Sequence, residues 1–297
     1  MNARRPCLAP ALRILWLAAG LLIAATWAGK APAQPSRIVS LNLCTDQLVM
    51  LMADRDNIAS VSYTAEDPDI SAYPDLARGL PVNYGLAEEV LAQNPDLVIS
   101  STFSPRPTLF LLRRLGYEVV EVPTVNSVDD IISNIRIVAD AVGAPEYGET
   151  LAAELARDFA AARPAADDTA RPLAVFYWAN GFTSGAGTLP DNILHAVGFR
   201  TVADEMGITG MRQLPLELLI TAEPDVLVIS QTRKTPALAN QIFSHPALAR
   251  AFAGRPVAFM PNTLFNCGTP AVAKAFDILS DLRKRFLANA RPAEVIR

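Results

Sequence analysis

Two segments far apart in the chain share one pattern, and this repeat limits the folds that the chain can form. The first segment is LAEEVLAQNPDLVISST at 86–102, and the second is LPLELLITAEPDVLVISQT at 214–232. In each, a glutamate stands seven residues before a Pro-Asp pair, and an apolar run that ends in serine follows the pair. The pattern predicts a short helix, a tight turn and a buried parallel strand. Two such units predict two lobes of similar construction.

The remaining segments alternate between β-rich runs and amphipathic helical patterns. Strands are predicted at 37–41, 58–62, 96–100, 118–122, 173–178, 225–230 and 256–260. Helices are predicted at 45–53, 86–93, 106–115, 127–142, 145–162, 189–197, 215–222, 235–242 and 269–288. Ser127 and Asp130 form a capping-box pattern, Gly143 ends the helix that they begin, and Pro145 suits the first turn of the next helix. This alternation predicts the α/β fold class, with two Rossmann-like lobes that contain parallel sheets and are joined by a single long helix.

The first 33 residues have the composition of a signal peptide. Arg4, Arg5 and Arg13 make a basic start, an apolar stretch covers 14–28, and Ala-Pro-Ala at 31–33 fits a cleavage site. The apolar stretch is shorter than the roughly 20 residues of a membrane-spanning helix. We therefore expect export to the periplasm with cleavage. The expected domains are a signal peptide at 1–33, an N-terminal α/β lobe at 36–125, a helical segment with the interlobe helix at 126–165, and a C-terminal α/β lobe at 172–290.

Charge argues against a nucleic-acid partner. The expected signal peptide holds four of the 26 basic side chains and none of the 30 acidic ones, so the mature chain would have a net charge of −8. An acidic chain binds the phosphate backbone of nucleic acids poorly.

Aromatic rings and uncharged hydrogen-bonding groups gather in the loops that follow the predicted strands. Ligands of open α/β sheets bind at the carboxyl ends of strands, and a concave site rich in rings binds a sizeable organic molecule. The alternative for each ring is a place in the core. The candidate ligand-binding residues are Asn42, Cys44, Thr45, Tyr63, Tyr84, Phe103, Trp178, Asn180, Phe182, Thr183, Arg233, Phe265 and Cys267.

No catalytic or metal-binding motif is recognisable. The two histidines, His195 and His245, lie in or beside predicted helices and have no partner at metal-ligand spacing. The segment GFTSGAG at 181–187 lacks the lysine of a phosphate-binding loop and differs from G-x-S-x-G. Asp46 could act as an acid or base, although it also stands where a helix cap is common. We predict no catalytic residue, no resident cofactor and no metal ligand.

Two cysteines, Cys44 and Cys267, remain after the expected cleavage, and each stands in a strand-end loop just before a helix. Three interpretations are open. An oxidising compartment favours a disulfide, which needs Cα atoms within about 7 Å. Free thiols at helix N-termini would instead face the ligand with a lowered pKa. The third interpretation is that both are small buried hydrophobes.

The order of these motifs resembles the periplasmic substrate-binding proteins of ABC importers for cobalamin and iron-siderophore complexes. The resemblance rests on RIVSLNLCTDQL, GLAEEVLAQNPDLVIS, FYWANGFTSGAGTLPDNILHAVGF, LPLELLITAEPDVLVIS and FMPNTLFNCGTPAVAKAFDIL, which together extend over 36–290. It implies two lobes with limited hinge motion, a metal chelate bound between them, and one exposed glutamate on each lobe that meets arginines of the permease dimer. Glu88 and Glu217 match those positions, and their alternative is a solvated helix charge.

The segments CTDQ and NCGTP are not general features of this family, so they indicate a subgroup with its own ligand. Basic residues near the expected cleft are few, namely Arg106, Arg212 and Arg233. A strongly anionic ferric siderophore would need several cations, whereas a corrinoid suits rings and amides, so the pattern slightly favours a corrinoid, with an iron-siderophore or haem as the alternative ligand. We expect a monomeric solute-binding protein. The alternatives are an exported enzyme that uses Cys44 or Asp46, and a scaffold that engages only a membrane partner.

Overall fold

The computed structural model describes residues 34–230 and 238–290 of the 297-residue chain. The described residues from Pro35 onward form one compact unit, and the expected signal peptide and Arg233 lie outside the described residues. Among the described residues, no helix combines the length and the apolar character that crossing a bilayer requires.

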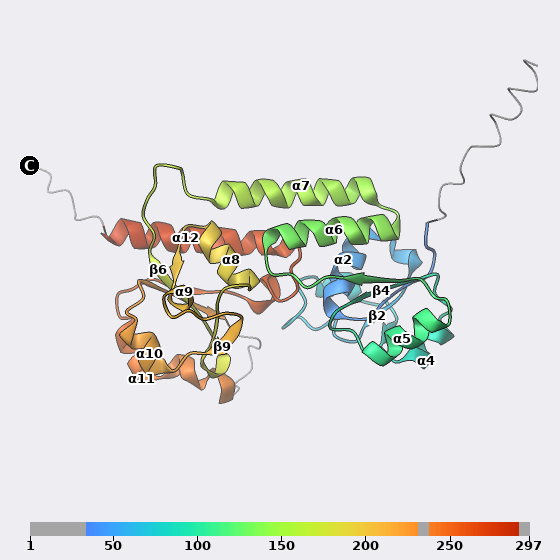
Figure 1. Ribbon diagram of the computed structural model, residues 1–297, viewed down its shortest axis with the longest axis horizontal. Coiled ribbons are helices and arrows are strands. Elements are labelled where there is room, and N and C mark those ends of the chain that lie inside the picture. Colours follow the sequence, from blue (N-terminus) through green and yellow to red (C-terminus); the bar gives the residue numbers. More distant parts are fainter. Residues whose placement is uncertain (1–33, 231–237, 291–297) are drawn as a thin grey trace, which may run out of the picture. The chain divides into compact units, whose positions relative to one another are not determined.

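The N-terminal lobe is built on a five-stranded sheet in which all pairs are parallel (Figure 1). Its order is β3 (Val82–Asn83), β2 (Ile58–Ser62), β1 (Ile38–Ser40), β4 (Leu97–Ser101) and β5 (Val119–Val122). Its helical elements are α2 (Leu43–Met52), η2 (Arg55–Asn57), α3 (Pro74–Ala77), α4 (Ala87–Ala92) and α5 (Arg106–Arg114). Alternate side chains of the central strands face opposite layers, since Leu97 and Ile99 belong to the core that includes α2, and Val98 packs with α4 and α5.

The C-terminal lobe contains a second sheet in the order β11 (Val257–Phe259), β10 (Val226–Ser230), β6 (Leu173–Trp178), β7 (Phe182–Ser184) and β9 (Met211–Gln213), with β8 (Arg200–Thr201) also paired to β6. The pairs of β6 with β10 and of β10 with β11 are parallel, whereas β7 is antiparallel to both β6 and β9. The predicted parallel pairing is present in this lobe, and β7 adds antiparallel pairs that the sequence pattern did not predict. A tight turn at 179–181 reverses the chain directly after β6, and Asn180 and Gly181 adopt the left-handed conformations that the reversal needs.

Helical elements surround this second sheet. Those described are η3 (Ala179–Gly181), α8 (Leu189–Ala196), α9 (Val202–Glu205), α10 (Leu216–Thr221), η4 (Leu238–Ser244), α11 (Pro246–Ala251), η5 (Asn262–Leu264), η6 (Pro270–Val272) and α12 (Ala273–Ala290). The segment predicted as a helix at 235–242 is a 3₁₀ turn where it is described.

The sequence repeat proves to be a structural repeat. Asp96 precedes β4, and its carboxylate accepts hydrogen bonds from the backbone N–H groups of Ser36 and Arg37, just before β1. Asp225 precedes β10, and its carboxylate accepts the N–H of Leu173 at the start of β6. Each Pro-Asp pair thus ends a short helix and caps the neighbouring central strand of its own lobe.

Helix α6 (Val128–Val142) packs on α2 of the N-terminal lobe, and α7 (Pro145–Ala162), the predicted interlobe helix, runs beside α6 and packs on α12 of the C-terminal lobe (Figure 1). The capping box of Ser127 and Asp130 and the left-handed Gly143 at the end of α6 are present as predicted. Helix α7 packs closely on α6 at Gly148, where an added Cβ would lie 2.2 Å from the Cβ of Ala139.

One buried apolar cluster crosses from lobe to lobe. It contains Ile99 of β4, Ile135 of α6, Phe276 of α12 and Val228 of β10. Because this core is continuous, the helical layer holds the carboxyl ends of the two sheets in a defined relation to each other.

Candidate ligand-binding site

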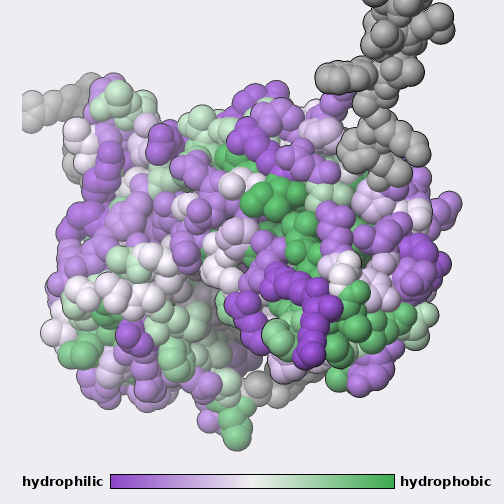
Figure 2. Space-filling view, turned by 45° about the vertical axis from the view of Figure 1, so that its right-hand side comes forward, coloured by the Kyte–Doolittle hydropathy of each residue, from purple (hydrophilic) through white to green (hydrophobic). Residues whose placement is uncertain are grey.

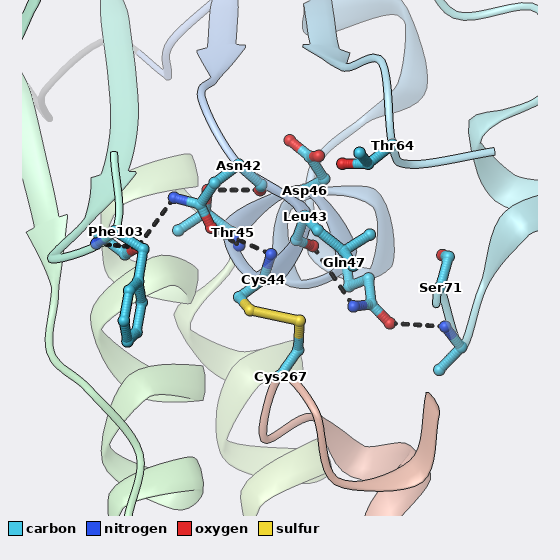
Figure 3. The surroundings of a disulfide bond; sticks show 12 residues. Asn42, Leu43, Cys44, Thr45, Asp46, Gln47, Thr64, Ser71, Phe103 and Cys267 are labelled. Atoms are coloured by element: carbon cyan, nitrogen blue, oxygen red, sulfur yellow. Dashed lines mark hydrogen bonds between the residues drawn. A yellow bond between two sulfur atoms is a disulfide. The ribbon is translucent and has the colours of Figure 1, made fainter. Parts of the chain in front are cut away.

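A disulfide joins the two lobes where their strand-end loops meet (Figure 3). Cys44 is the second residue of α2, Cys267 lies in the loop that precedes η6, and their Cα atoms are 4.7 Å apart. The approach is close at the next residue too, since a Cβ added to Gly268 would lie 2.6 Å from Val125 Cγ1. Gly268 also has a φ of +60°, which favours glycine. Of the three interpretations of the cysteines, the structure contains the disulfide.

The side chain of Asn42 forms hydrogen bonds within the protein at this corner. Its Oδ1 accepts the backbone N–H groups of Cys44 at 3.0 Å and Thr45 at 3.3 Å, so it is the N-cap of α2. Its Nδ2 donates to the hydroxyls of Ser101 and Ser104 after β4. Because both donors and the acceptor are occupied, Asn42 fixes the position of Cys44 and has little capacity left for a ligand.

Asp46 lies beneath this corner and does not reach the surface. Its side chain is buried, and its Oδ2 accepts hydrogen bonds from the N–H and the hydroxyl of Ser62. Burial raises the pKa of Asp46 to about 6, although the hydrogen bonds oppose the shift. This geometry favours a structural role for Asp46, because no substrate in the cleft could contact its carboxylate.

Three exposed rings line the carboxyl edge of the N-terminal sheet, and we call Tyr63, Tyr84 and Phe103 the aromatic rim. They follow β2, β3 and β4, and their exposed fractions are 59%, 61% and 76%. The rings of Tyr63 and Tyr84 are stacked, with centroids 5.0 Å apart. Rings as exposed as these offer apolar faces that a flat ligand could cover.

The C-terminal lobe presents its rings differently. Trp178 is half-buried, donates its Nε1–H to Ser184 Oγ, and packs edge-on against Phe265. Phe265 is buried in the core, so a ligand could reach only its edge. Asn180 and Phe182 are exposed beyond the end of β6.

Two predicted hydroxyl groups are internal. Thr183 is buried and donates to the carbonyl of Phe176, and Thr45 is buried and donates to the carbonyl of Asn42. Both residues were predicted to bind the ligand because they stand near the ends of strands. Their hydroxyls instead donate hydrogen bonds to backbone carbonyl groups.

A small cavity of about 140 Å³ lies between the lobes beside the disulfide. Thr102 and Thr124 line this cavity, and their hydroxyls form a hydrogen bond of 2.8 Å. The sequence patterns did not identify these two residues as candidates. Its volume is below the ~300 Å³ of small ligand pockets, so a large ligand would lie over the cavity and against the aromatic rim. The residues that line it are Cys44, Thr45, Leu48, Ser101, Thr102, Phe103, Val122, Pro123, Thr124, Val125, Asn134, Phe265, Asn266, Cys267 and Gly268.

A comparison with known families agrees with this architecture. The model of the family described as "Periplasmic binding protein" matches residues 38–258. The chain belongs to the periplasmic binding protein family. The resemblance seen in the sequence motifs is thereby confirmed.

Individual relatives of this periplasmic binding protein carry names that refer to tetrapyrrole ligands. A "Cobalamin-binding protein" of Halobacterium salinarum is 27% identical over 199 residues, which cover 66% of this chain and 54% of the relative. The chain therefore spans about half the length of that curated relative. The periplasmic heme-binding protein RhuT of Roseiflexus sp. RS-1, in apo form, has 28% identity and a TM-score of 0.68, covering 86% of this chain and 99% of its own. The vitamin B12 binding protein BtuF of Vibrio cholerae shares the fold at 17% identity and a TM-score of 0.65, covering 86% of this chain and 98% of its own.

Few free cations lie near the cleft of this binding protein. Arg106 pairs with Glu121 at 2.9 Å, and Arg113 shares the same carboxylate, which lowers the pKa of Glu121. Arg212 is exposed and forms no ion pair within the described residues. Among the described residues around the cleft, the positive charge is therefore low, and most of it is paired with Glu121.

Glu88 and Glu217 occupy equivalent places in the two lobes of the binding protein. Each is the second residue of its helix, α4 or α10, each is exposed, and neither forms an ion pair in the part of the chain that the structure describes. Leu86 and Leu218 are exposed beside them. Hydrophobic and strongly hydrophilic residues adjoin on the lobe that carries α4 and α5 (Figure 2).

Proposed function

We propose that the protein is the solute-binding component of an ABC importer and captures a metal chelate of the tetrapyrrole class between its lobes. The observation that carries the proposal is the aromatic rim, which follows the strands β2, β3 and β4 of one sheet at the edge where α/β folds bind ligands. Relatives named for cobalamin and heme binding support the ligand class.

Within this class we favour a corrinoid as the ligand. Exposed rings and amides suit a bulky and nearly uncharged macrocycle, whereas a ferric siderophore of high negative charge would need several unpaired arginines. Haem is the second candidate, because Tyr63 and Tyr84 expose phenol oxygens of the kind that can ligate haem iron.

A fluorescence titration tests the ligand assignment. Two of the three tryptophans, Trp16 and Trp27, lie in the expected signal peptide, so Trp178 would be the sole tryptophan of the mature protein. We expect cyanocobalamin or haemin to quench its emission with a dissociation constant below about 10 μM. If neither compound nor a ferric siderophore binds this tightly, the assignment fails.

The second part of the proposal is delivery to a permease in the inner membrane. Two exposed glutamates in equivalent positions suit a partner with two-fold symmetry that presents basic residues to each lobe. The disulfide supports the periplasm as the compartment, because such bonds persist in oxidising surroundings. We propose that the protein acts as a monomer.

An enzymatic role through Cys44 or Asp46 has little geometric support. The sulfur of Cys44 is bonded to Cys267, and the carboxylate of Asp46 is buried beneath Ser62. If an activity were found, its loss in a Cys44→Ser, Asp46→Asn double variant that still folds would favour the enzyme over the binding protein.

A further inference from the structure

Three potential metal ligands meet on the C-terminal lobe, outside the ligand cleft. One ligand atom from each of Asp191, His195 and Asp204 lies within 4.8 Å of the others. The His195 Nε2 atom is 3.5 Å from Asp191 Oδ2 and 2.7 Å from Asp204 Oδ2. We propose that these three atoms bind a divalent transition-metal ion of the Zn²⁺ type.

The helices α8 and α9 bring the side chains of Asp191, His195 and Asp204 close together. Asp191 and His195 are four residues apart on α8, so they lie on the same face of that helix. Asp204 comes from the short helix α9, which Thr201 caps. The Thr201 hydroxyl also donates to Asp191 Oδ1, so it orients this carboxylate as outer-shell groups do at metal sites.

The second oxygen of Asp191 is the sign that the cluster is more than a simple ion pair. The Asp191 side chain is only 7% exposed, yet its Oδ2 lies 3.5 Å from His195 Nε2, a distance too long for a good hydrogen bond. A carboxylate oxygen with so weak a partner, on a side chain that is mostly buried, can accept a metal ion at little cost. His195 and Asp204 are half-exposed, so an ion could enter from solvent.

Distances and donor types favour a small transition metal. Ligand atoms about 2.0–2.2 Å from a tetrahedral Zn²⁺ are separated from one another by about 3.3–3.6 Å. The pair at 3.5 Å already has this spacing, and the pair at 2.7 Å would need to open by about 0.6 Å. One imidazole and two carboxylates carry two negative charges when the imidazole is neutral, and a water molecule would complete the coordination.

The site is separate from the proposed chelate site. Strand β8, directly before the helix α9 that carries Asp204, pairs with Leu173 and Ala174 at the amino end of β6. Trp178, by contrast, is the last residue of β6, at the cleft. In Figure 1, α8 and α9 lie beside β6 within the C-terminal lobe. A bound ion would therefore join α8 to α9 without contacting the chelate.

Calorimetric titration of the untagged, metal-stripped full chain with ZnCl₂ tests the site, and the visible spectrum of the Co²⁺-loaded protein reports its geometry. We expect one equivalent of Zn²⁺ to bind and Co²⁺ to show a tetrahedral spectrum. The variants His195→Gln and Asp204→Asn should each weaken the affinity for Zn²⁺ by more than about tenfold.

The matched control is His245→Gln, which removes the other histidine of the chain and should bind Zn²⁺ like the wild type. Circular dichroism checks that the variants fold, as expected for half-exposed side chains. Absence of a stoichiometric Zn²⁺ site in the wild type, or equal affinity in all variants, would overturn the proposal. No chelate is present in the titration, so its result does not depend on the proposed transport function.

Discussion

The Cα atoms of Cys44 and Cys267 lie 4.7 Å apart, although 223 residues separate the two cysteines in the chain. The N-cap of Asn42 places one cysteine at the start of α2, and the contact of Gly268 with Val125 brings the other to it. A bond between the lobes at this point restrains their separation beside the cavity.

Replacing both cysteines should therefore destabilise the protein. We expect the Cys44→Ser, Cys267→Ser double variant to lose about 2–5 kcal/mol of unfolding free energy, since the bond closes a long loop in the unfolded chain. Urea denaturation measures the loss. Reductant should reproduce it in the wild type and have no effect on the double variant; equal stability of the oxidised and reduced wild type would contradict the expectation.

Gly148→Ala should destabilise the α6–α7 pair even though alanine is the better helix former. Helix propensity alone predicts a gain of about 1 kcal/mol. The new methyl group would meet Ala139 Cβ at 2.2 Å, and such overpacking costs about 1–3 kcal/mol. We expect a net loss in thermal or urea denaturation.

Ala139→Gly provides the matched test of that contact. Combined with Gly148→Ala, it should restore part of the lost stability, and the four proteins form a double-mutant cycle. A Gly148→Ala variant that is more stable than the wild type would show that the helices can separate without cost.

Asp46 should make the stability of the protein decrease as the pH rises from about 4 to about 6. Its pKa in the folded protein is about 6, above the ordinary value of 3.8, so in this window the unfolded chain ionises while the folded protein retains the proton. The unfolding free energy contributed by this group should fall by about 3 kcal/mol across the window and stay lower above it.

The neutral variant Asp46→Asn lacks this titration. The stability of the variant relative to the wild type should rise through the same window, as measured by urea denaturation across a pH series. Ser62→Ala, which removes one donor to the carboxylate, should extend the wild-type decrease to higher pH. A stability difference between Asp46→Asn and wild type that does not vary with pH would count against the raised pKa.

The aromatic rim should supply chelate affinity through its ring faces. Tyr63→Ala and Tyr84→Ala are each expected to weaken binding by roughly tenfold, from lost stacking and lost apolar contact. Tyr147→Ala is the control, because Tyr147 is also exposed but lies on α7. The titration of Trp178 fluorescence gives each affinity.

Tyr63→Phe and Tyr84→Phe separate stacking from metal ligation. If the rings act only by stacking, both variants should bind like the wild type. If a phenol oxygen ligates haem iron, one of them should shift the haem absorption spectrum and lose affinity. Undiminished binding in the alanine variants would remove the rim from the site.

Charge reversal at the exposed glutamates should impair delivery and spare ligand capture. Glu88→Arg and Glu217→Arg should each reduce chelate-stimulated ATP hydrolysis by the permease, because like charges would face each other, while the affinity for the chelate stays the same. Glu118→Arg is the control, since the exposed Glu118 precedes β5 at the opposite end of the sheet. Equal stimulation by all three variants would exclude these glutamates from the interface.

Much of the fold could be predicted because its signals act over a few residues. The capping box at Ser127 and Asp130, the Pro-Asp turns and the buried runs of β4 and β10 each specify an element within one or two turns of chain. The candidate site was less predictable. Exposed rings such as Tyr63 and buried ones such as Phe265 look alike in the sequence, because burial depends on segments that are distant in the chain.

Local periodicity and turn chemistry, which can be recognised in the sequence alone, are sufficient to specify two α/β lobes of repeated design with a helical connection. Four further outcomes become apparent in the folded protein alone: Cys44 bonds to Cys267, Asp46 is buried, β7 runs antiparallel, and Asp191, His195 and Asp204 meet. Each of these outcomes depends on the distance between groups brought together by packing, which residue spacing along the chain does not encode.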